Sequence, residues 1–141
     1  MNSGTGENHV RVVLDTNILI SAIGFGGAPR AALLLAIQEK IKGVISPVLL
    51  IELIEVINKK FPKLIPDLLG IEASINESFL IVQPKKSLNI VRDIDDNKVL
   101  EAAVEGRCDF IITGDQDLLE LGMFKGIKIV TPVQFLEEVE S

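Results

Sequence analysis

The chain has 141 residues, which suits one domain with a hydrophobic core, and 48% of them are hydrophobic, which excludes a disordered chain. The formal net charge of −6 argues against the broadly basic surface on which most nucleic-acid binders depend, although clustered site carboxylates would account for part of it. No run reaches the roughly 18 apolar residues of a membrane span, and the single cysteine cannot form an internal disulfide, so we expect a cytoplasmic protein with no membrane partner.

Short apolar runs alternate with stretches of helical periodicity along the chain. Residues 1–9 are polar and are expected to form a flexible lead-in to a single domain over residues 10–141. Strands are predicted over residues 10–14, 44–46, 79–82, 110–113 and 127–130. Helices are predicted over residues 16–24, 31–42, 47–60, 62–76, 96–107, 116–121 and 132–140. This alternation predicts a three-layer α/β/α sandwich around a central parallel five-stranded sheet.

Two aspartates follow predicted strands that lie far apart in the sequence. Asp15 comes directly after residues 10–14, and Asp115 follows residues 110–113 across a single glycine. A carboxylate at the end of a buried strand loses hydration, and open parallel sheets place their sites at this edge. If the strand order reverses between the first and fourth strands, the two aspartates become neighbours. Each could instead serve only as the N-cap of the helix that follows.

Further acidic residues lie in the predicted helices. Glu52 interrupts the apolar stretch 48–54, so its side chain must face water, a partner or a metal, or form a plain polar stripe with Glu55. Asp93, Asp95 and Asp96 cluster where a helix begins, with Asp95 or Asp96 as the expected cap. The helix dipole explains one or two of them, but three repel one another unless a cation is near. A pocket of such carboxylates favours a hard cation such as Mg²⁺, and with it chemistry on phosphate.

Other kinds of site find little support in the sequence. His9 is the single histidine and lies near the N-terminus, so serine or cysteine triads lack a base, and zinc sites lack their Cys and His clusters. The glycine-rich residues 24–27 match no phosphate-binding loop and are expected to form a helix break or a mobile flap. Basic residues form two small groups that are either ordinary solvated surface or a rim for a phosphate backbone. They are Lys59, Lys60, Lys63, Lys85 and Lys86.

The order and spacing of these segments resemble those of a PIN-domain ribonuclease over residues 10–138. The resemblance rests on residues 14–17 (LDTN), Glu52, residues 96–103 (DNKVLEAA), residues 113–119 (TGDQDLL), and residues 127–132 with Phe135 and Leu136. Each piece is short, and their order along the chain is what makes the pattern specific. Within the family, the chain is most similar to the VapC-like branch, the predicted toxin components of prokaryotic toxin–antitoxin pairs.

The resemblance implies a ribonuclease that needs Mg²⁺ or Mn²⁺ and hydrolyses phosphodiester bonds of RNA. It also implies an antitoxin protein as a partner and, often, a homodimer. By position in the motifs, the expected metal-binding and catalytic residues are Asp15, Glu52, Asp96 and Asp115. Supporting roles are expected for Asn17, Thr113, Asp117 and Asp93. Among these, Thr113 is expected to orient Asp115 through a hydrogen bond.

Two alternatives stay open at the level of sequence. A phosphatase similar to the haloacid dehalogenases also has an aspartate after its first strand, but such enzymes need a second acid two residues later, where this chain has Asn17. A catalytically silent metal-binding or RNA-binding scaffold of the same fold would keep the four acids without turnover.

Overall fold

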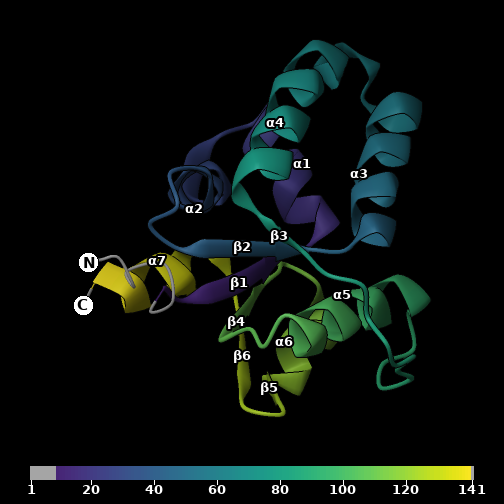
Figure 1. Ribbon diagram of the computed structural model, residues 1–141, viewed down its shortest axis with the longest axis vertical. Helices are drawn as coiled ribbons and strands as arrows, with labels where there is room; N and C mark the ends of the chain where they lie inside the picture. Colours follow the sequence, from purple (N-terminus) through teal and green to yellow (C-terminus); the bar gives the residue numbers. More distant parts are fainter. Residues whose placement is uncertain (1–8, 141) are drawn as a thin grey trace.

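The computed structural model describes residues 9–140, so the predicted lead-in over residues 1–9 lies almost wholly outside the described part of the chain. A six-stranded sheet in the order β3-β2-β1-β4-β6-β5 forms the centre (Figure 1). Its parallel strands are β1 (Arg11–Leu14), β2 (Lys42–Ile45), β3 (Leu80–Ile81), β4 (Phe110–Ile112) and β6 (Ile127–Val130). The predicted α/β architecture is therefore confirmed.

The sheet has one strand more than predicted. Strand β5 (Met123–Phe124) pairs antiparallel with β6 at the edge of the sheet, so the prediction of five parallel strands was short by this strand. The two residues of its turn, Lys125 and Gly126, have φ of 50° and 80°, as a tight hairpin turn of the primed type requires. A strand of two residues is too short to show an alternating hydrophobic pattern, which is why the sequence analysis did not find it.

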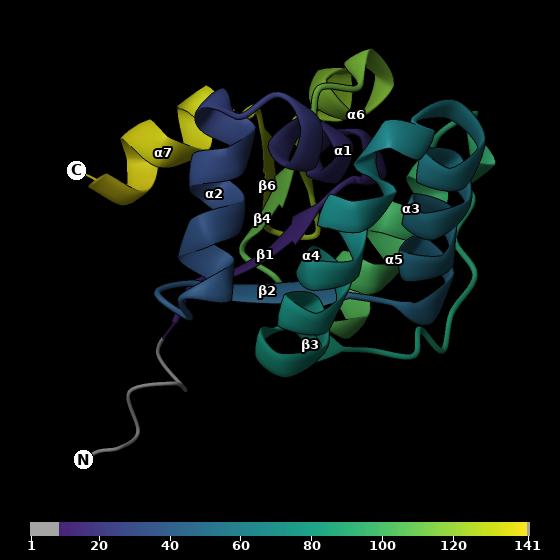
Figure 2. The same cartoon turned by 90° about the horizontal axis from the view of Figure 1, so that it is seen from above.

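Helices cover both faces of the sheet, as Figures 1 and 2 show. The helices are α1 (Thr16–Gly24), α2 (Gly27–Ile37), α3 (Pro47–Lys60), α4 (Ile65–Ser78), α5 (Ile94–Glu105), α6 (Gln116–Leu121) and α7 (Pro132–Glu140), and a 3₁₀ turn (Pro62–Leu64) joins α3 to α4. Helix α5 packs on β1, β2 and β4, across the sheet from α2, which packs on β2 and α7. Within residues 9–140, no single helix is long and apolar enough to cross a membrane; α1 and α2 reach that length and composition only as a pair, bent by 101°.

Helix α2 ends earlier than its hydrophobic pattern predicts. The prediction extended it to residue 42, but α2 ends at Ile37, and Lys42 and Gly43 belong to β2. Glu39 leaves the helix with φ of 58°, and Lys42 pairs with Arg11 of β1. Gly43 has a packing role instead, because a Cβ there would lie 2.6 Å from the ring of Phe79. Pairing with the central strand outweighs the local helical pattern.

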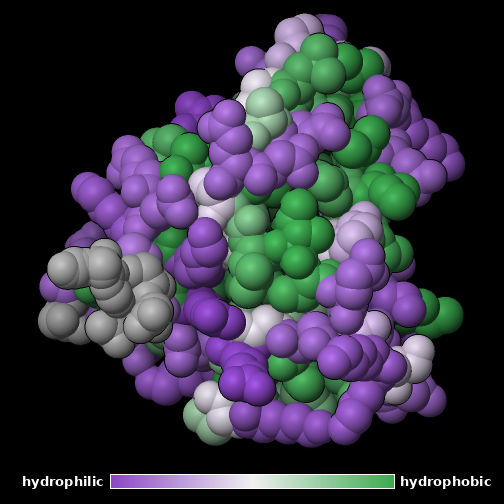
Figure 3. Space-filling view, viewed as in Figure 1, coloured by the Kyte–Doolittle hydropathy of each residue, from purple (hydrophilic) through white to green (hydrophobic). Residues whose placement is uncertain are grey.

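The core lies between the sheet and its helices. Three successive residues of β1, Val12, Val13 and Leu14, are buried, which is the pattern of a parallel strand covered on both faces. Cys108 is also buried, as expected, and burial raises the pKa of its thiol to about 12. In the view of Figure 3, hydrophobic residues reach the surface near the middle, where Figure 1 draws β3 and the end of α4. That edge strand is only two residues long, which limits its tendency to pair with other chains.

The strand order reverses between the parallel neighbours β1 and β4, which is the condition under which Asp15 and Asp115 were expected to become neighbours. Leu14 lies opposite Ile112, and the backbone N–H of Asp15 donates to the carbonyl of Ile112 at 3.1 Å. The helices that follow the two strands leave from adjacent strand ends. This topology opens a crevice at the carboxyl edge of the sheet, where open α/β folds bind their ligands.

Candidate metal centre

The two strand-end aspartates are helix caps and pocket residues at the same time. Asp15 caps α1, where its Oδ1 accepts from the N–H of Ile18 at 2.9 Å, and Asp115 caps α6, where its Oδ1 accepts from the N–H of Leu118 at 3.1 Å. Capping and a functional role are therefore compatible, although the sequence analysis treated them as alternatives. The caps also fix the orientation of both carboxylates relative to the sheet.

Thr113 joins the two strand ends. Its hydroxyl donates to Oδ2 of Asp15 and accepts from the backbone N–H of Asp115 at 2.9 Å. The prediction gave Thr113 the role of orienting the carboxylate of Asp115; its hydroxyl instead orients the carboxylate of Asp15 and holds the backbone of Asp115. Thr113 is fully buried, so this arrangement is shielded from competing water.

The start of α5 brings a third aspartate to the pocket. Asp93 is the N-cap and accepts from the N–H of Asp95 at 2.8 Å, so the prediction of a cap at Asp95 or Asp96 was wrong. Asp96 lies in the first turn instead, with 9% of its surface exposed, and faces the strand ends. The side-chain amide of Asn97 fixes this turn, because it accepts from the N–H groups of Ile90 and Val91 and donates to the carbonyls of Val91 and Asp93.

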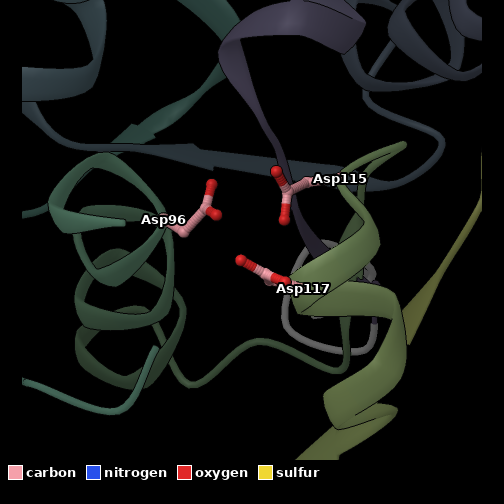
Figure 4. Close-up of side chains that lie close together, drawn as sticks. All are labelled: Asp96, Asp115 and Asp117. Carbon is pink, nitrogen blue, oxygen red and sulfur yellow. The ribbon is translucent and has the colours of Figure 1, made fainter. Parts of the chain in front are cut away.

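Three carboxylates approach one another at the spacing of metal ligands. Within residues 9–140, Asp96, Asp115 and Asp117 offer oxygen atoms that all lie within 4.8 Å of one another, and Figure 4 shows their side chains pointing into a common space between α5 and α6. The buried Oδ2 of Asp96 has no hydrogen-bond partner among the described residues. Arg92 reaches Asp117 only at 4.0 Å from a side chain that is 93% exposed. A hard cation would supply the missing partner, since it prefers carboxylate oxygens.

Glu52 faces the same pocket from α3. The hydroxyl of Thr16 donates to its Oε1 at 2.6 Å, which links the first turn of α1 to α3. The pocket has a volume of about 210 Å³, and all four acids predicted as catalytic line it. So do Asn17 and Asp93, predicted as supporting residues. Asp117, the other acid predicted as a supporting residue, lies in the group with Asp96 and Asp115, whereas both oxygens of Asp15 already accept hydrogen bonds.

Burial and mutual repulsion make these acids hold protons more tightly. Burial is the main cause that raises the pKa of Asp96 to about 7, and the hydrogen bond and charge of Asp115 add to it. Burial also raises the pKa of Asp15, against the opposing effect of the hydroxyl of Thr113, and it raises the pKa of Glu52 together with the charge of Asp95. The pocket therefore favours either protons or a cation at neutral pH.

The pocket also contains three residues that were not among the predicted site residues: Thr16, Asp95 and Lys60. Thr16 directly follows Asp15, the aspartate at the end of the first strand. A hydroxyl at that position is a sequence signal for a hydrogen bond to a neighbouring acid. Asp95 was noted only as a possible cap, and its charge acts on Glu52. Lys60 ends α3, about two helical turns beyond Glu52. Nothing in its local sequence shows that the end of α3 lies near the acids.

Comparison with known proteins assigns the fold to a family. The PIN domain family model matches residues 11–117. The uncharacterized protein MJ1680 of Methanocaldococcus jannaschii is 35% identical over 145 aligned positions, which cover 94% of this chain and 93% of that protein. The crystal structure of VapBC2 from Rickettsia felis bound to a DNA fragment from their promoter contains a chain of similar fold, with a TM-score of 0.56, 14% identity, and coverage of 85% of this chain and 97% of that one. The chain therefore belongs to the PIN-domain family.

Proposed function

We propose that this protein is a metal-dependent ribonuclease that hydrolyses phosphodiester bonds of RNA. The observation that carries the proposal is the group formed by Asp96, Asp115 and Asp117 at the switch point of the sheet, with a buried oxygen of Asp96 that lacks a partner among the described residues. Such an oxygen is costly to bury unless a ligand completes its contacts. Membership of the PIN-domain family supports the same assignment.

The donor set fits Mg²⁺ or Mn²⁺. Asp96, Asp115 and Asp117 would hold the ion, with Asp15 and Glu52 at the same pocket. All these donors are carboxylates, which hard divalent cations prefer, and no histidine or cysteine among them would select a softer metal. A bound Mg²⁺ or Mn²⁺ would lower the pKa of a coordinated water and neutralise charge on the phosphate oxygens.

The protein's own contribution is to fix the acids before substrate arrives. Thr113 and the N–H of Ile18 hold both oxygens of Asp15, and the N–H of Leu118 holds Oδ1 of Asp115. Thr16 holds Oε1 of Glu52, so that this side chain points into the pocket rather than along α3. Supporting bonds of this kind orient ligands and keep the site from reorganising during reaction.

The biological role that fits this reading is that of a toxin in a toxin–antitoxin pair in the cytoplasm. The sequence resemblance to VapC-like proteins and the similar fold in VapBC2 support an antitoxin partner, and a homodimer is consistent with the same family. The haloacid-dehalogenase-like alternative loses its basis, because the family match covers the segments on which it rested. A catalytically silent scaffold would share the pocket and differ only in turnover.

The test is cleavage of a mixed pool of structured RNA in the presence of Mn²⁺, Mg²⁺ or EDTA. Cleavage should require metal and should be lost in Asp15→Asn and Asp96→Asn, while Asp67→Asn, an exposed acid on α4, should keep full activity. Cleavage that persists in Asp96→Asn would refute the site. Stabilisation by Mn²⁺ without cleavage of any RNA would instead favour the silent scaffold.

A further inference from the structure

An apolar hollow lies beside the carboxylate pocket and has no part in the proposed chemistry. It has a volume of about 300 Å³ and lies where the end of α1 meets the junction of α3 and the 3₁₀ turn. Its lining residues, which define the aromatic hollow, are Gly24, Phe25, Lys60, Phe61, Pro62, Lys63 and Leu64. Of the six phenylalanines, all within the described part of the chain, Phe25 alone is exposed, with 76% of its surface open to solvent. An exposed aromatic ring beside an apolar hollow offers a face on which a planar ligand can stack.

The backbone holds Phe25 in this outward position. Gly24 lets the chain pass close to Leu64, because a Cβ on Gly24 would lie 2.9 Å from Cδ1 of that leucine. After Phe25 the chain turns through Gly26 and Gly27, whose φ values are 83° and 67°. Arg30 fastens the turn, since its guanidinium donates to two carbonyls at the end of α1 at 2.8 and 3.1 Å. The glycine-rich segment is thus a turn held in place by the hydrogen bonds of Arg30, and it exposes the ring of Phe25 to solvent.

Two lysines, Lys60 and Lys63, line the aromatic hollow, and Lys59 is next to Lys60 in the sequence. Lys59 and Lys60 end α3, and Lys63 lies in the 3₁₀ turn, all exposed. Within residues 9–140, none of their ammonium groups forms an ion pair, although the chain carries an excess of acids. The dipole of α3 accounts for cations in its last turn, but not for Lys63, which lies beyond the helix. Lys60 lines both the aromatic hollow and the carboxylate pocket, so one lysine borders both sites.

We propose that the aromatic hollow binds an unpaired base of an RNA strand whose backbone passes Lys60 on its way to the carboxylate pocket. This inference rests on the proposed ribonuclease function and adds a subsite for one unpaired base beside the carboxylate pocket. The ring of Phe25 provides a stacking face, and Lys60 and Lys63 contact phosphates on either side of the base. A base inside a duplex has no free face for Phe25, so double-stranded RNA does not fit.

The first experiment separates the base from the backbone. Binding is measured by fluorescence anisotropy in EDTA, which prevents cutting, with a short labelled oligoadenylate and with a ribose-phosphate strand of equal length that lacks bases. Phe25→Ala should weaken oligoadenylate binding by about fivefold or more and leave binding of the base-free strand unchanged. Met123→Ala is the matched control, because Met123 is 53% exposed on the distant edge strand β5 and should bind both strands as wild type does.

A second variant uses the absence of tryptophan from the chain. Phe25→Trp would introduce a single indole at an exposed position and should restore or strengthen stacking. Its fluorescence should be quenched by oligoadenylate and not by the base-free strand. Lys63→Gln should reduce the dependence of log Kd on log salt by about 0.7 for a single strand, whereas Lys40→Gln, an exposed lysine at the far end of α2, should not.

The outcomes separate the aromatic hollow from the proposed function. If wild type cuts RNA with Mn²⁺ but Phe25→Ala binds oligoadenylate unchanged, the aromatic hollow is not the base site and the ribonuclease stands. Equal binding of duplex and single-stranded RNA, or no quenching of Phe25→Trp, also overturns the inference. If wild type neither binds nor cuts any RNA, both proposals fail together.

Discussion

Replacing Asp96 by asparagine should stabilise the protein when no metal is present. The folded state raises the pKa of Asp96 from 3.8 to about 7, so at higher pH the folded protein must carry a charge that the unfolded chain carries more easily. The resulting penalty is absent below the unfolded pKa, grows between about pH 4 and pH 7, and is complete above the folded pKa. Asparagine keeps the shape of the side chain and removes the charge.

The size of the effect follows from the same shift. A rise in pKa from 3.8 to about 7 corresponds to about 4 kcal/mol as an upper bound. Water reaches the mouth of the pocket and screens the carboxylate, so we expect about 1–2 kcal/mol in the measured free energy of unfolding. The free energy of unfolding of Asp96→Asn should therefore exceed that of wild type by this amount at about pH 8 and equal it at about pH 4.

Urea unfolding in EDTA, followed by circular dichroism at both pH values, measures this difference. Comparing the two proteins at each pH cancels the contributions of Asp15 and Glu52, whose pKa values are also raised. Asp67→Asn should change stability by less than about 0.5 kcal/mol at either pH, because its side chain is exposed. A gain of equal size at both pH values, or a loss at about pH 8, would refute the repulsion argument. Added Mn²⁺ should make wild type more stable than Asp96→Asn, since only wild type keeps the full ligand group.

Three further predictions concern the pocket and the sheet. Mn²⁺ should bind more tightly at pH 8 than at pH 6 and release protons on binding, which calorimetry in two buffers detects; affinity independent of pH would contradict the raised pKa values. Thr113→Val should lower Mn²⁺ affinity by about 10–100-fold because the backbone of Asp115 loses its hydrogen bond and Asp15 loses its fixed orientation, and unchanged affinity in a titration followed by thermal melting would contradict this. Gly43→Ala should destabilise the fold by about 1–3 kcal/mol through contact with Phe79, whereas Gly70→Ala, in open space within α4, should stabilise it by up to about 1 kcal/mol; thermal melting that shows equal effects would refute the packing argument.

The sequence by itself determined the order of the elements and the positions of the main acids. Residues 12–14 and 110–112 are short, fully apolar runs, so burial on both faces follows from their composition alone. The acids that follow them lie at strand ends whatever the details of packing. Parallel topology places the carboxyl ends of both strands at one edge of the sheet, so the sequence could indicate that the two acids become neighbours if the strand order reverses between β1 and β4, as it does.

Local patterns were less reliable where a longer-range contact competes with them. The periodicity of residues 31–42 favours one helix, but pairing of Lys42 with β1 ends it early. The three aspartates at the start of α5 are equally good N-cap candidates in the sequence. Only the hydrogen bonds between Asn97 and the preceding loop select Asp93 as the cap. Once Asp93 caps the helix, Asp96 is left to face the strand ends.

Only the tertiary structure decided which oxygens meet. Asp117 lies near Asp96 because α6 and α5 pack at adjacent places along the sheet edge, and these helices are separated by a strand in sequence. Thr113 bonds to Asp15 across two strands, and Lys60 reaches the pocket from the far end of α3. Such contacts depend on distances between segments that are remote along the chain. Hydrophobic periodicity reports only which face of one segment is buried, so it cannot specify them.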